Sequence, residues 1–141
     1  KICPITGDLV SCSQRWDSPN YWVRVFDAKG RHKQVMEVEL PRKGIIHDLQ
    51  ITANYVVIFY APTYHSVEKA MKGEDPFVWE PELGTKIIAI PRDGSGENIV
   101  FETESFFSWH FCNGFESGGK IVLDYVWINS ILFTQAQGTG V

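Results

Sequence analysis

The chain has 141 residues, of which 44% are apolar, 13% aromatic and 21% charged, a composition that supports a hydrophobic core and excludes a disordered or collagen-like chain. The formal net charge is −4 and the Lys and Arg residues form no cluster, which excludes the electrostatic footprint of a nucleic-acid-binding protein. No apolar run approaches the roughly 18 residues that span a bilayer. Because the sequence starts at Lys1 without Met, we expect residues 1–141 to be an excised part of a single domain.

The cysteines indicate a compartment. Their number is odd, they show no CxxC spacing, and the chain has no Asn-x-Ser/Thr sequon; they are Cys3, Cys12 and Cys112. A secreted disulfide framework is therefore not expected. We predict a reducing compartment, the cytoplasm.

The first half of the chain predicts strands. Tyr21–Phe26 and residues 35–40 flank the turn-rich tetrapeptide 27–30, a pattern typical of a β-hairpin with one solvated face. Residues 45–52 alternate between apolar and polar side chains and predict a further strand. The continuous apolar run Tyr55–Tyr60 predicts a central strand that is buried on both faces.

The second half begins with an interruption. Residues 61–76 contain two Pro and one Gly and predict a long loop with a helical turn around residues 67–71. Strand patterns resume at residues 86–90, 98–102, 106–112 and 120–127, with a turn at residues 93–96. A strand every ten to twelve residues or so indicates a meandering all-β fold, which is a sandwich, a barrel or a propeller.

His47 and His110 are the candidate metal ligands. Each falls among apolar neighbours in the middle of a predicted strand, where an imidazole is expected to be buried. They are 63 residues apart, so a metal site would have to be assembled by the fold from distant strands. Imidazole suits Fe, Cu, Ni or Zn, and carboxylates are then expected to orient the ligands. On spacing alone, a core histidine hydrogen-bonded to a carbonyl or carboxylate is the commoner explanation.

The remaining polar candidates are weaker. His32 follows the predicted hairpin turn and His65 lies in the predicted loop, so both are expected to be solvated surface residues. Cys112 lies in an apolar strand without a cation or helix N-terminus to activate its thiol, and we predict that it packs in the core. No phosphate-binding loop or nucleophile elbow occurs.

Three phrases follow one another along the chain: residues 44–55 (GIIHDLQITANY), residues 79–86 and 90–94 (WEPELGTK and IPRDG), and residues 107–116 (FSWHFCNGFE). Together they resemble the carotenoid cleavage oxygenase family, which includes stilbene-cleaving enzymes. Residues 44–55 (GIIHDLQITANY) resemble the family phrase His-Asp-Phe-x-Ile-Thr-x-x-Tyr, which carries an iron histidine. Residues 79–86 (WEPELGTK) and 90–94 (IPRDG) resemble Trp-x-Pro-Glu-x-Gly-Thr and Ile-Pro-Arg-x-Gly. Residues 107–116 (FSWHFCNGFE) resemble Phe-x-His-x-x-Asn-Ala-x-Glu, which carries the next iron histidine.

The resemblance also defines what the chain lacks and where it departs. Residues 1–8 (KICPITGD) are similar to a phrase that follows the family's first iron histidine, so that ligand is expected just before Lys1. Leu49 and Gln50 stand where Phe and Ala are commoner, Gly114 stands where Ala is usual, and Ser117 replaces a frequent acidic residue. None of these departures removes a ligand, and they leave the substrate open.

The resemblance implies a portion of a seven-bladed β-propeller with a mononuclear non-haem Fe(II) on its axis, held by four histidines that include His47 and His110. It implies that O2 and a small apolar conjugated substrate, a carotenoid, apocarotenoid or stilbene, react to give two carbonyl products. An aromatic tunnel would hold the substrate, and Phe106, Phe107, Trp109 and Phe111 line that tunnel or pack in the core. We interpret Glu116 as a turn-shaping residue, and we expect Asp48 to face away from His47.

A rival hypothesis comes from another class of protein. A propeller segment with only half of a metal site is expected to be catalytically incomplete, and it would then act only as a module that binds apolar ligands or a partner. Peripheral membrane contact and oligomeric state stay open. Iron analysis of the protein and of its histidine variants distinguishes the two hypotheses.

Overall fold

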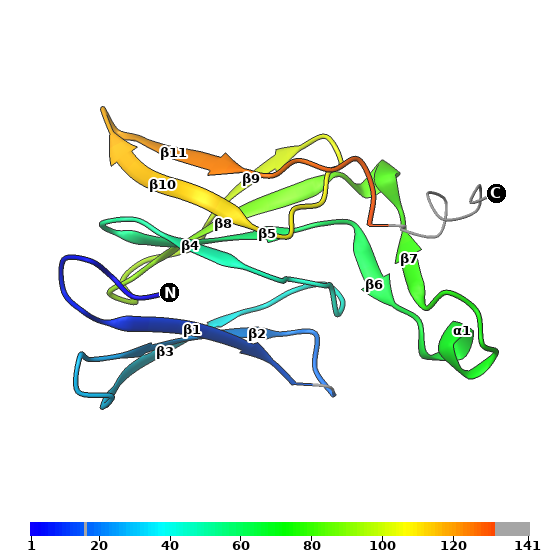
Figure 1. Ribbon diagram of the computed structural model, residues 1–141, viewed down its shortest axis with the longest axis horizontal. Helices are drawn as coiled ribbons and strands as arrows, with labels where there is room; N and C mark the ends of the chain where they lie inside the picture. The colour runs from blue at the N-terminus through cyan, green and yellow to red at the C-terminus, as the bar shows by residue number, and fades with distance from the viewer. Residues whose placement is uncertain (16, 132–141) are drawn as a thin grey trace, which may run out of the picture.

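Strands dominate the computed structural model, which describes residues 1–15 and 17–131. In chain order the elements are β1 (Leu9–Gln14), β2 (Tyr21–Phe26), β3 (His32–Val38), β4 (Leu49–Ile51), β5 (Tyr55–Tyr60), β6 (Thr63–His65), α1 (Val67–Met71), β7 (Phe77–Trp79), the 3-10 helix η1 (Pro81–Leu83), β8 (Thr85–Pro91), β9 (Ile99–Thr103), β10 (Phe111–Ser117) and β11 (Lys120–Tyr125). The all-β prediction is confirmed. Figure 1 shows three stacked layers of sheet and a short arm at one side.

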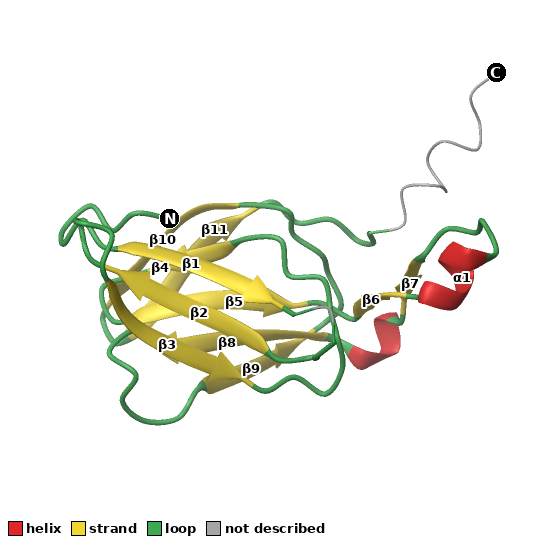
Figure 2. Ribbon diagram, turned by 90° about the horizontal axis from the view of Figure 1, so that it is seen from below, coloured by secondary structure: helices red, strands yellow, loops and turns green. Residues whose placement is uncertain are grey.

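Every strand pair among the described residues is antiparallel. The first layer is the sheet β1-β2-β3, the middle layer is β4-β5-β8-β9, and the third layer is β10-β11. The arm joins β5 to β8 and consists of the β6-β7 pair with α1 between them. Figure 2 shows α1 in this arm, beyond the ends of the long strands, and η1 follows β7 on the way to β8.

The central strands β5 and β8 of the middle layer are buried on both faces because their residues alternate between two cores, whereas the edge strand β9 is exposed. Val56 and Ile58 of β5 pack with first-layer residues such as Val23. Their neighbours Val57 and Phe59 pack instead against residues of the third layer and the segment leading into it. The period-2 geometry of a strand sends successive side chains to opposite faces. The predicted two-faced central strand is therefore confirmed.

Several other predictions hold, and one is wrong in part. The hairpin is the β2-β3 pair, which keeps Glu37 exposed and Met36 buried. The predicted helical turn is α1. The predicted loop at residues 61–76 is more ordered than expected, since β6 pairs with β7 in the register Thr63↔Trp79 and closes the arm.

The two strands predicted around the histidines are shorter than the alternating pattern suggested. β4 starts only at Leu49 and β10 only at Phe111. Before β10, the buried hydroxyl of Thr85 accepts a hydrogen bond from the backbone N–H of Phe106 (3.0 Å) and donates one to the carbonyl of Phe106 (2.8 Å). A side chain thus satisfies the backbone groups that a strand partner would otherwise bind. Phe106 and Phe107 are both buried, so alternation fails there.

Candidate metal centre

His47 and His110 each lie at the entrance of the first strand of a layer. His47 is two residues before β4, and His110 is immediately before β10. β4 and β10 are in contact, and the two ring centroids are 5.4 Å apart with an angle of 75° between the planes. The fold therefore brings together two side chains that are 63 residues apart in the sequence.

The environment of the pair differs from the sequence expectation. Both histidines were predicted in mid-strand and buried, whereas both lie outside strands and are exposed. The physical reason is that the ladders start only after them, so no neighbouring strand covers their side chains. The ring of Trp109 packs edge-on against His47 at 4.8 Å between centroids and closes one side of the pair.

The spacing of the two rings fits joint ligation of one metal ion. With a metal–nitrogen bond of about 2.1 Å, each ring centroid lies about 3.2 Å from the ion, and two adjacent imidazoles are then about 4.6 to 5.5 Å apart. The separation of 5.4 Å lies within this range. Among residues 1–15 and 17–131, no group of three or more His, Cys, Asp or Glu could hold a metal. The pair could therefore supply at most part of a ligand set.

Asp48 links the two histidine segments, a role that sequence reasoning missed. Its carboxylate accepts hydrogen bonds from the backbone N–H of Phe111 (2.9 Å) and of Leu49 (2.8 Å), and the Lys1 ammonium lies 3.1 Å from it. Burial raises the pKa of Asp48, but the Phe111 N–H, the Lys1 ammonium and the Leu49 N–H together hold that pKa below its usual value. The sequence signal that could have indicated this role is the position of Asp48, next to His47 in a family-like phrase.

The peptide group between His110 and Phe111 is held at both ends. The N–H of Phe111 donates to Asp48. The carbonyl of His110 accepts hydrogen bonds from the hydroxyl of Ser108 (3.1 Å) and from the backbone N–H of Val126 (3.2 Å). The backbone of His110 is therefore fixed from three directions even though its ring is exposed.

Glu116 links β10 to the turn between β4 and β5, which confirms its turn-shaping role. Its carboxylate accepts hydrogen bonds from the Thr52 hydroxyl (2.6 Å), the Asn54 backbone N–H (2.7 Å) and the Asn54 side-chain amide (2.8 Å). The guanidinium of Arg92 donates to the Thr52 carbonyl at 2.8 Å. Residues of all three family-like phrases thus meet at one turn. Asp48 and Glu116 join the middle and third layers at opposite ends of the β4–β10 contact.

The aromatic residues near His110 serve mainly as core. Phe106 and Phe111 belong to the core between the middle and third layers, and Phe107 belongs to a third cluster near the arm. Trp109 is half-buried and contacts both His47 and Phe107. Of the four residues considered for a tunnel, Trp109 is the one whose ring contacts a candidate ligand.

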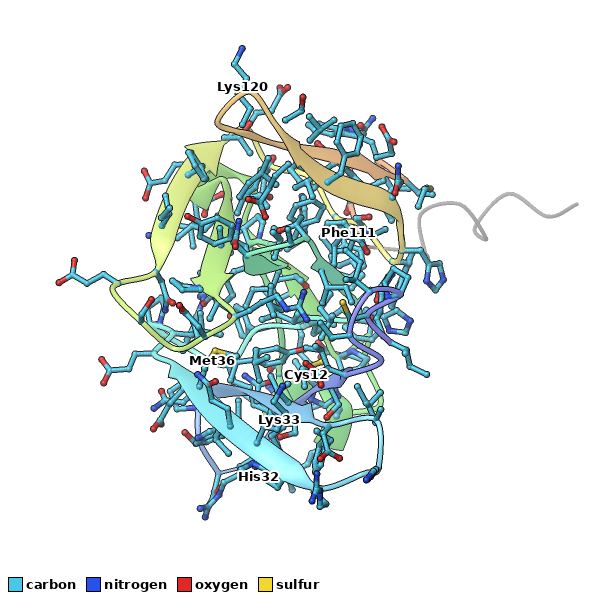
Figure 3. The ribbon with its side chains drawn as sticks, turned by 90° about the vertical axis from the view of Figure 1, so that its left-hand side faces the viewer. Cys12, His32, Lys33, Met36, Phe111 and Lys120 are labelled. Carbon is cyan, nitrogen blue, oxygen red and sulfur yellow. The ribbon has the colours of Figure 1, made fainter. Side chains whose placement is uncertain are left out.

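The other sequence candidates lie outside the pair. His32 and His65 are exposed, as predicted, and Figure 3 shows His32 near the bottom of the view, well below Phe111. The prediction for Cys112 was wrong, because Cys112 is exposed. It lies at the irregular start of the β10-β11 pairing, between Phe111 and Asn113, where its side chain does not follow the expected alternation.

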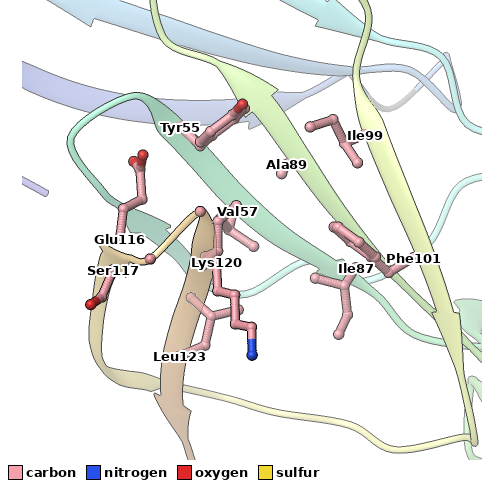
Figure 4. Close-up of a pocket in the computed structure, with 13 residues that line it drawn as sticks. Tyr55, Val57, Ile87, Ala89, Ile99, Phe101, Glu116, Ser117, Lys120 and Leu123 are labelled. Carbon is pink, nitrogen blue, oxygen red and sulfur yellow. The ribbon is translucent and has the colours of Figure 1, made fainter.

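An apolar cavity of about 750 Å³ lies between the middle and third layers. Figure 4 shows residues from both layers around it, including Val57, Ile87, Phe101 and Leu123. Neither candidate histidine lines this cavity. It is therefore separate from the histidine pair.

Comparisons with known proteins show which family and fold this chain is similar to. Residues 1–139 match the family described as RPE65, retinal pigment epithelial membrane protein. Isoeugenol monooxygenase from Pseudomonas nitroreducens is 30% identical over 128 residues, which are 88% of this chain and 27% of that protein. Resveratrol cleavage oxygenase 1 from Aspergillus fumigatus is 30% identical over 130 residues, covering 88% of this chain and 26% of that protein. The crystal structure of Pseudomonas brassicacearum lignostilbene dioxygenase superposes with a TM-score of 0.82 at 25% identity, over 94% of this chain and 29% of that one.

The chain belongs to the RPE65 family, which is the carotenoid cleavage oxygenase family. Its three layers are consequently part of a β-propeller, as predicted. The chain spans just over a quarter of the length of the curated relatives named here. No helix among the described residues is long and apolar enough to cross a membrane.

Proposed function

We propose that the full-length protein containing this chain is a non-haem Fe(II) dioxygenase that cleaves a conjugated C=C bond with O2 to give two carbonyl products. The observation that supports it is the 5.4 Å approach of the His47 and His110 rings in a family whose named relatives include a resveratrol cleavage oxygenase and a lignostilbene dioxygenase. The proposed substrate is a small apolar conjugated molecule, which is a stilbene, a carotenoid or an apocarotenoid.

The described residues have defined tasks in this mechanism. His47 and His110 would hold the iron through neutral imidazoles, and the remaining ligands would come from outside the described residues. When bound, the iron supplies the one-electron chemistry that allows O2 to react with the alkene. Asp48 keeps the two ligand segments together, and Trp109 shields one side of His47 from water.

Histidine replacement in the full-length protein tests this proposal. We expect iron near one equivalent in the wild type, and loss of most of this iron together with carbonyl products in His47→Ala and in His110→Ala. His32→Ala is the matched control, because His32 is an exposed histidine on β3, and it should retain both. Full iron retention in both site variants would sink the proposal. A substrate panel of resveratrol, isoeugenol and an apocarotenal identifies the alkene class.

A second candidate function is binding without chemistry, which the cavity between the layers favours. Its lining is mainly apolar, with Val57, Ile87, Ala89 and Phe101 among its residues, and such a surface suits an apolar ligand. If this is the function, His47→Ala should bind a fluorescent polyene with wild-type affinity, because His47 does not line the cavity. Ala89→Trp should lose that affinity, because Ala89 lines the cavity and the larger side chain fills it. Equal loss in both variants would argue against the cavity.

We also propose that the arm contacts membranes peripherally. Val67 and Met71 lie one helical turn apart on α1 with exposed fractions of 66% and 85%, and apolar side chains so exposed suit insertion at a bilayer surface. Liposome co-sedimentation of the full-length protein should fall in Val67→Asp/Met71→Asp. It should not change in Ile5→Asp, where the side chain is 83% exposed but lies outside the arm. A cytoplasmic location stays a prediction.

A further inference from the structure

The separation of the two imidazoles depends on how the middle and third layers are joined beside them. His47 and Asp48 are adjacent in sequence, and Asp48 accepts a hydrogen bond from the N–H of Phe111, the residue after His110. The Asp48 carboxylate thus connects the segment that carries His47 directly to the segment that carries His110. The Ser108 and Val126 hydrogen bonds fix the His110 carbonyl to the third layer alone, so they do not set its distance from His47.

The carboxylate of Asp48 is itself held in place. Its side chain is 20% exposed, its first oxygen accepts from the N–H of Leu49 at 2.8 Å, and its second lies 3.1 Å from the Lys1 ammonium. A group with restrained rotamers transmits position, because a displacement of one segment must displace the other. Hydrogen bonds between a carboxylate and backbone N–H groups are also among the stronger ones in proteins.

We propose that Asp48 is a positioning residue that fixes the distance between His47 and His110 and thereby sets the affinity of the metal centre. This inference rests on the proposed iron site. The carboxylate does not touch substrate or the metal in this role. It acts by keeping the Phe111 N–H, and hence the His110 backbone, at a constant position relative to His47.

Glu116 provides the matched control. It also joins the third layer to the middle layer through a carboxylate, but it binds the turn at Thr52 and Asn54, at the end of β4 away from His47. Loss of Glu116 should therefore weaken the contact between layers without changing the geometry of the histidine pair. A general loss of stability would affect both variants alike, whereas a positional effect would affect only Asp48 variants.

The experiment measures Co²⁺ binding to the full-length apoprotein by chelator competition and records the Co²⁺ absorption spectrum. Asp48→Ala should weaken Co²⁺ binding about 10- to 100-fold and change the spectrum. Asp48→Asn keeps an oxygen that can accept the Phe111 N–H, so it should retain most of the affinity. Glu116→Ala should bind as the wild type does. If Asp48→Ala does not fold, Asp48→Ser replaces it in the experiment. The Ser side chain is shorter than that of Asp, so its hydroxyl cannot reach the Phe111 N–H that the Asp48 carboxylate binds at 2.9 Å.

The outcomes separate this inference from the proposed function. Wild-type affinity and spectrum in Asp48→Ala, or an equal loss in Glu116→Ala, overturn the positioning role while the His47 dependence of Co²⁺ binding still supports a metal site. Co²⁺ binding that is absent from the wild type, or unchanged in His47→Ala, overturns the metal site and the positioning role with it.

Discussion

Gly114 lies against Gln50 where the middle and third layers meet, so that a methyl group at residue 114 would collide with this neighbour. A Cβ atom there would lie 2.4 Å from Cγ of Gln50, 3.0 Å from Nε2 and 3.2 Å from Cδ. Reaching ordinary contact requires a shift of about 1 Å, and Gln50 is only 8% exposed, so the side chain has little room to yield. We expect Gly114→Ala to cost about 1–3 kcal/mol of unfolding free energy, as overpacking usually does.

The same collision should vanish when Gln50 is shortened. Gln50→Ala removes all three atoms that the new methyl would meet, and in that background Gly114→Ala should be neutral or stabilise by about 0.5–1 kcal/mol, since Gly is poor in a strand. The double-mutant cycle should then give a coupling of about 2 kcal/mol. We therefore predict that Gln50 and Gly114, which both stand where Ala is commoner in the family-like phrases, compensate each other sterically.

Urea denaturation of the full-length protein and the three variants measures this cycle. Gly44→Ala is the matched control, because its Cβ would lie 2.5 Å from the Tyr60 ring and would not meet Gln50. Combined with Gln50→Ala, the Gly44 change should be additive within about 0.5 kcal/mol. A coupling below about 0.5 kcal/mol between residues 50 and 114 would refute the steric argument.

Three further predictions concern stability. Thr85→Val should cost about 2–3 kcal/mol in urea denaturation, because two buried backbone groups of Phe106 lose their partner; Thr85→Ser should retain most of the stability. Burial raises the pKa of Glu116, but hydrogen bonds from Thr52 and Asn54 hold that pKa below its ordinary value. The stabilisation that Glu116 provides is therefore present above about pH 4.3 and is lost as the pH falls through the folded-state pKa. The melting temperature of Glu116→Gln should consequently fall less on acidification than that of the wild type. Gly84→Ala should cost about 2 kcal/mol or more, since φ is +64° and its Cβ would lie 2.6 Å from a backbone oxygen of β9, whereas Gly73→Ala, at φ +72° with no atom within 4 Å, should cost only about 1 kcal/mol.

Periodicity predicted the elements whose environment is uniform along their length. β5 is apolar at every position because a layer covers each face, and the β2-β3 hairpin alternates because one face meets solvent. Periodicity failed at residues 45–48 and 106–110, where Asp48 and Thr85 replace ladder hydrogen bonds with side-chain ones. A pattern of hydrophobicity contains no information on that exchange.

The sequence indicated which residues belong to the candidate site, but it did not predict how the structure holds them together. The phrases around His47 and His110 indicated both residues, and the approach of their rings agrees with that hypothesis, while ligation itself stays a prediction. The link through Asp48 depends on how β4 and β10, strands of two different sheets, are placed against each other. Strand alternation gave no partner for Asp48, which lies just before the strand.

The burial of β5 on both faces has a consequence for engineering. Val56 and Ile58 belong to one core, and Val57 and Phe59 belong to the other. Alternate residues of this one hexapeptide therefore form two interfaces, one with the first layer and one with the third layer. Mutating every second residue changes one interface and leaves the other unchanged. A library that varies the even positions alone would retune the contact between the first two layers, while the histidine pair, which depends on the other interface, keeps its support.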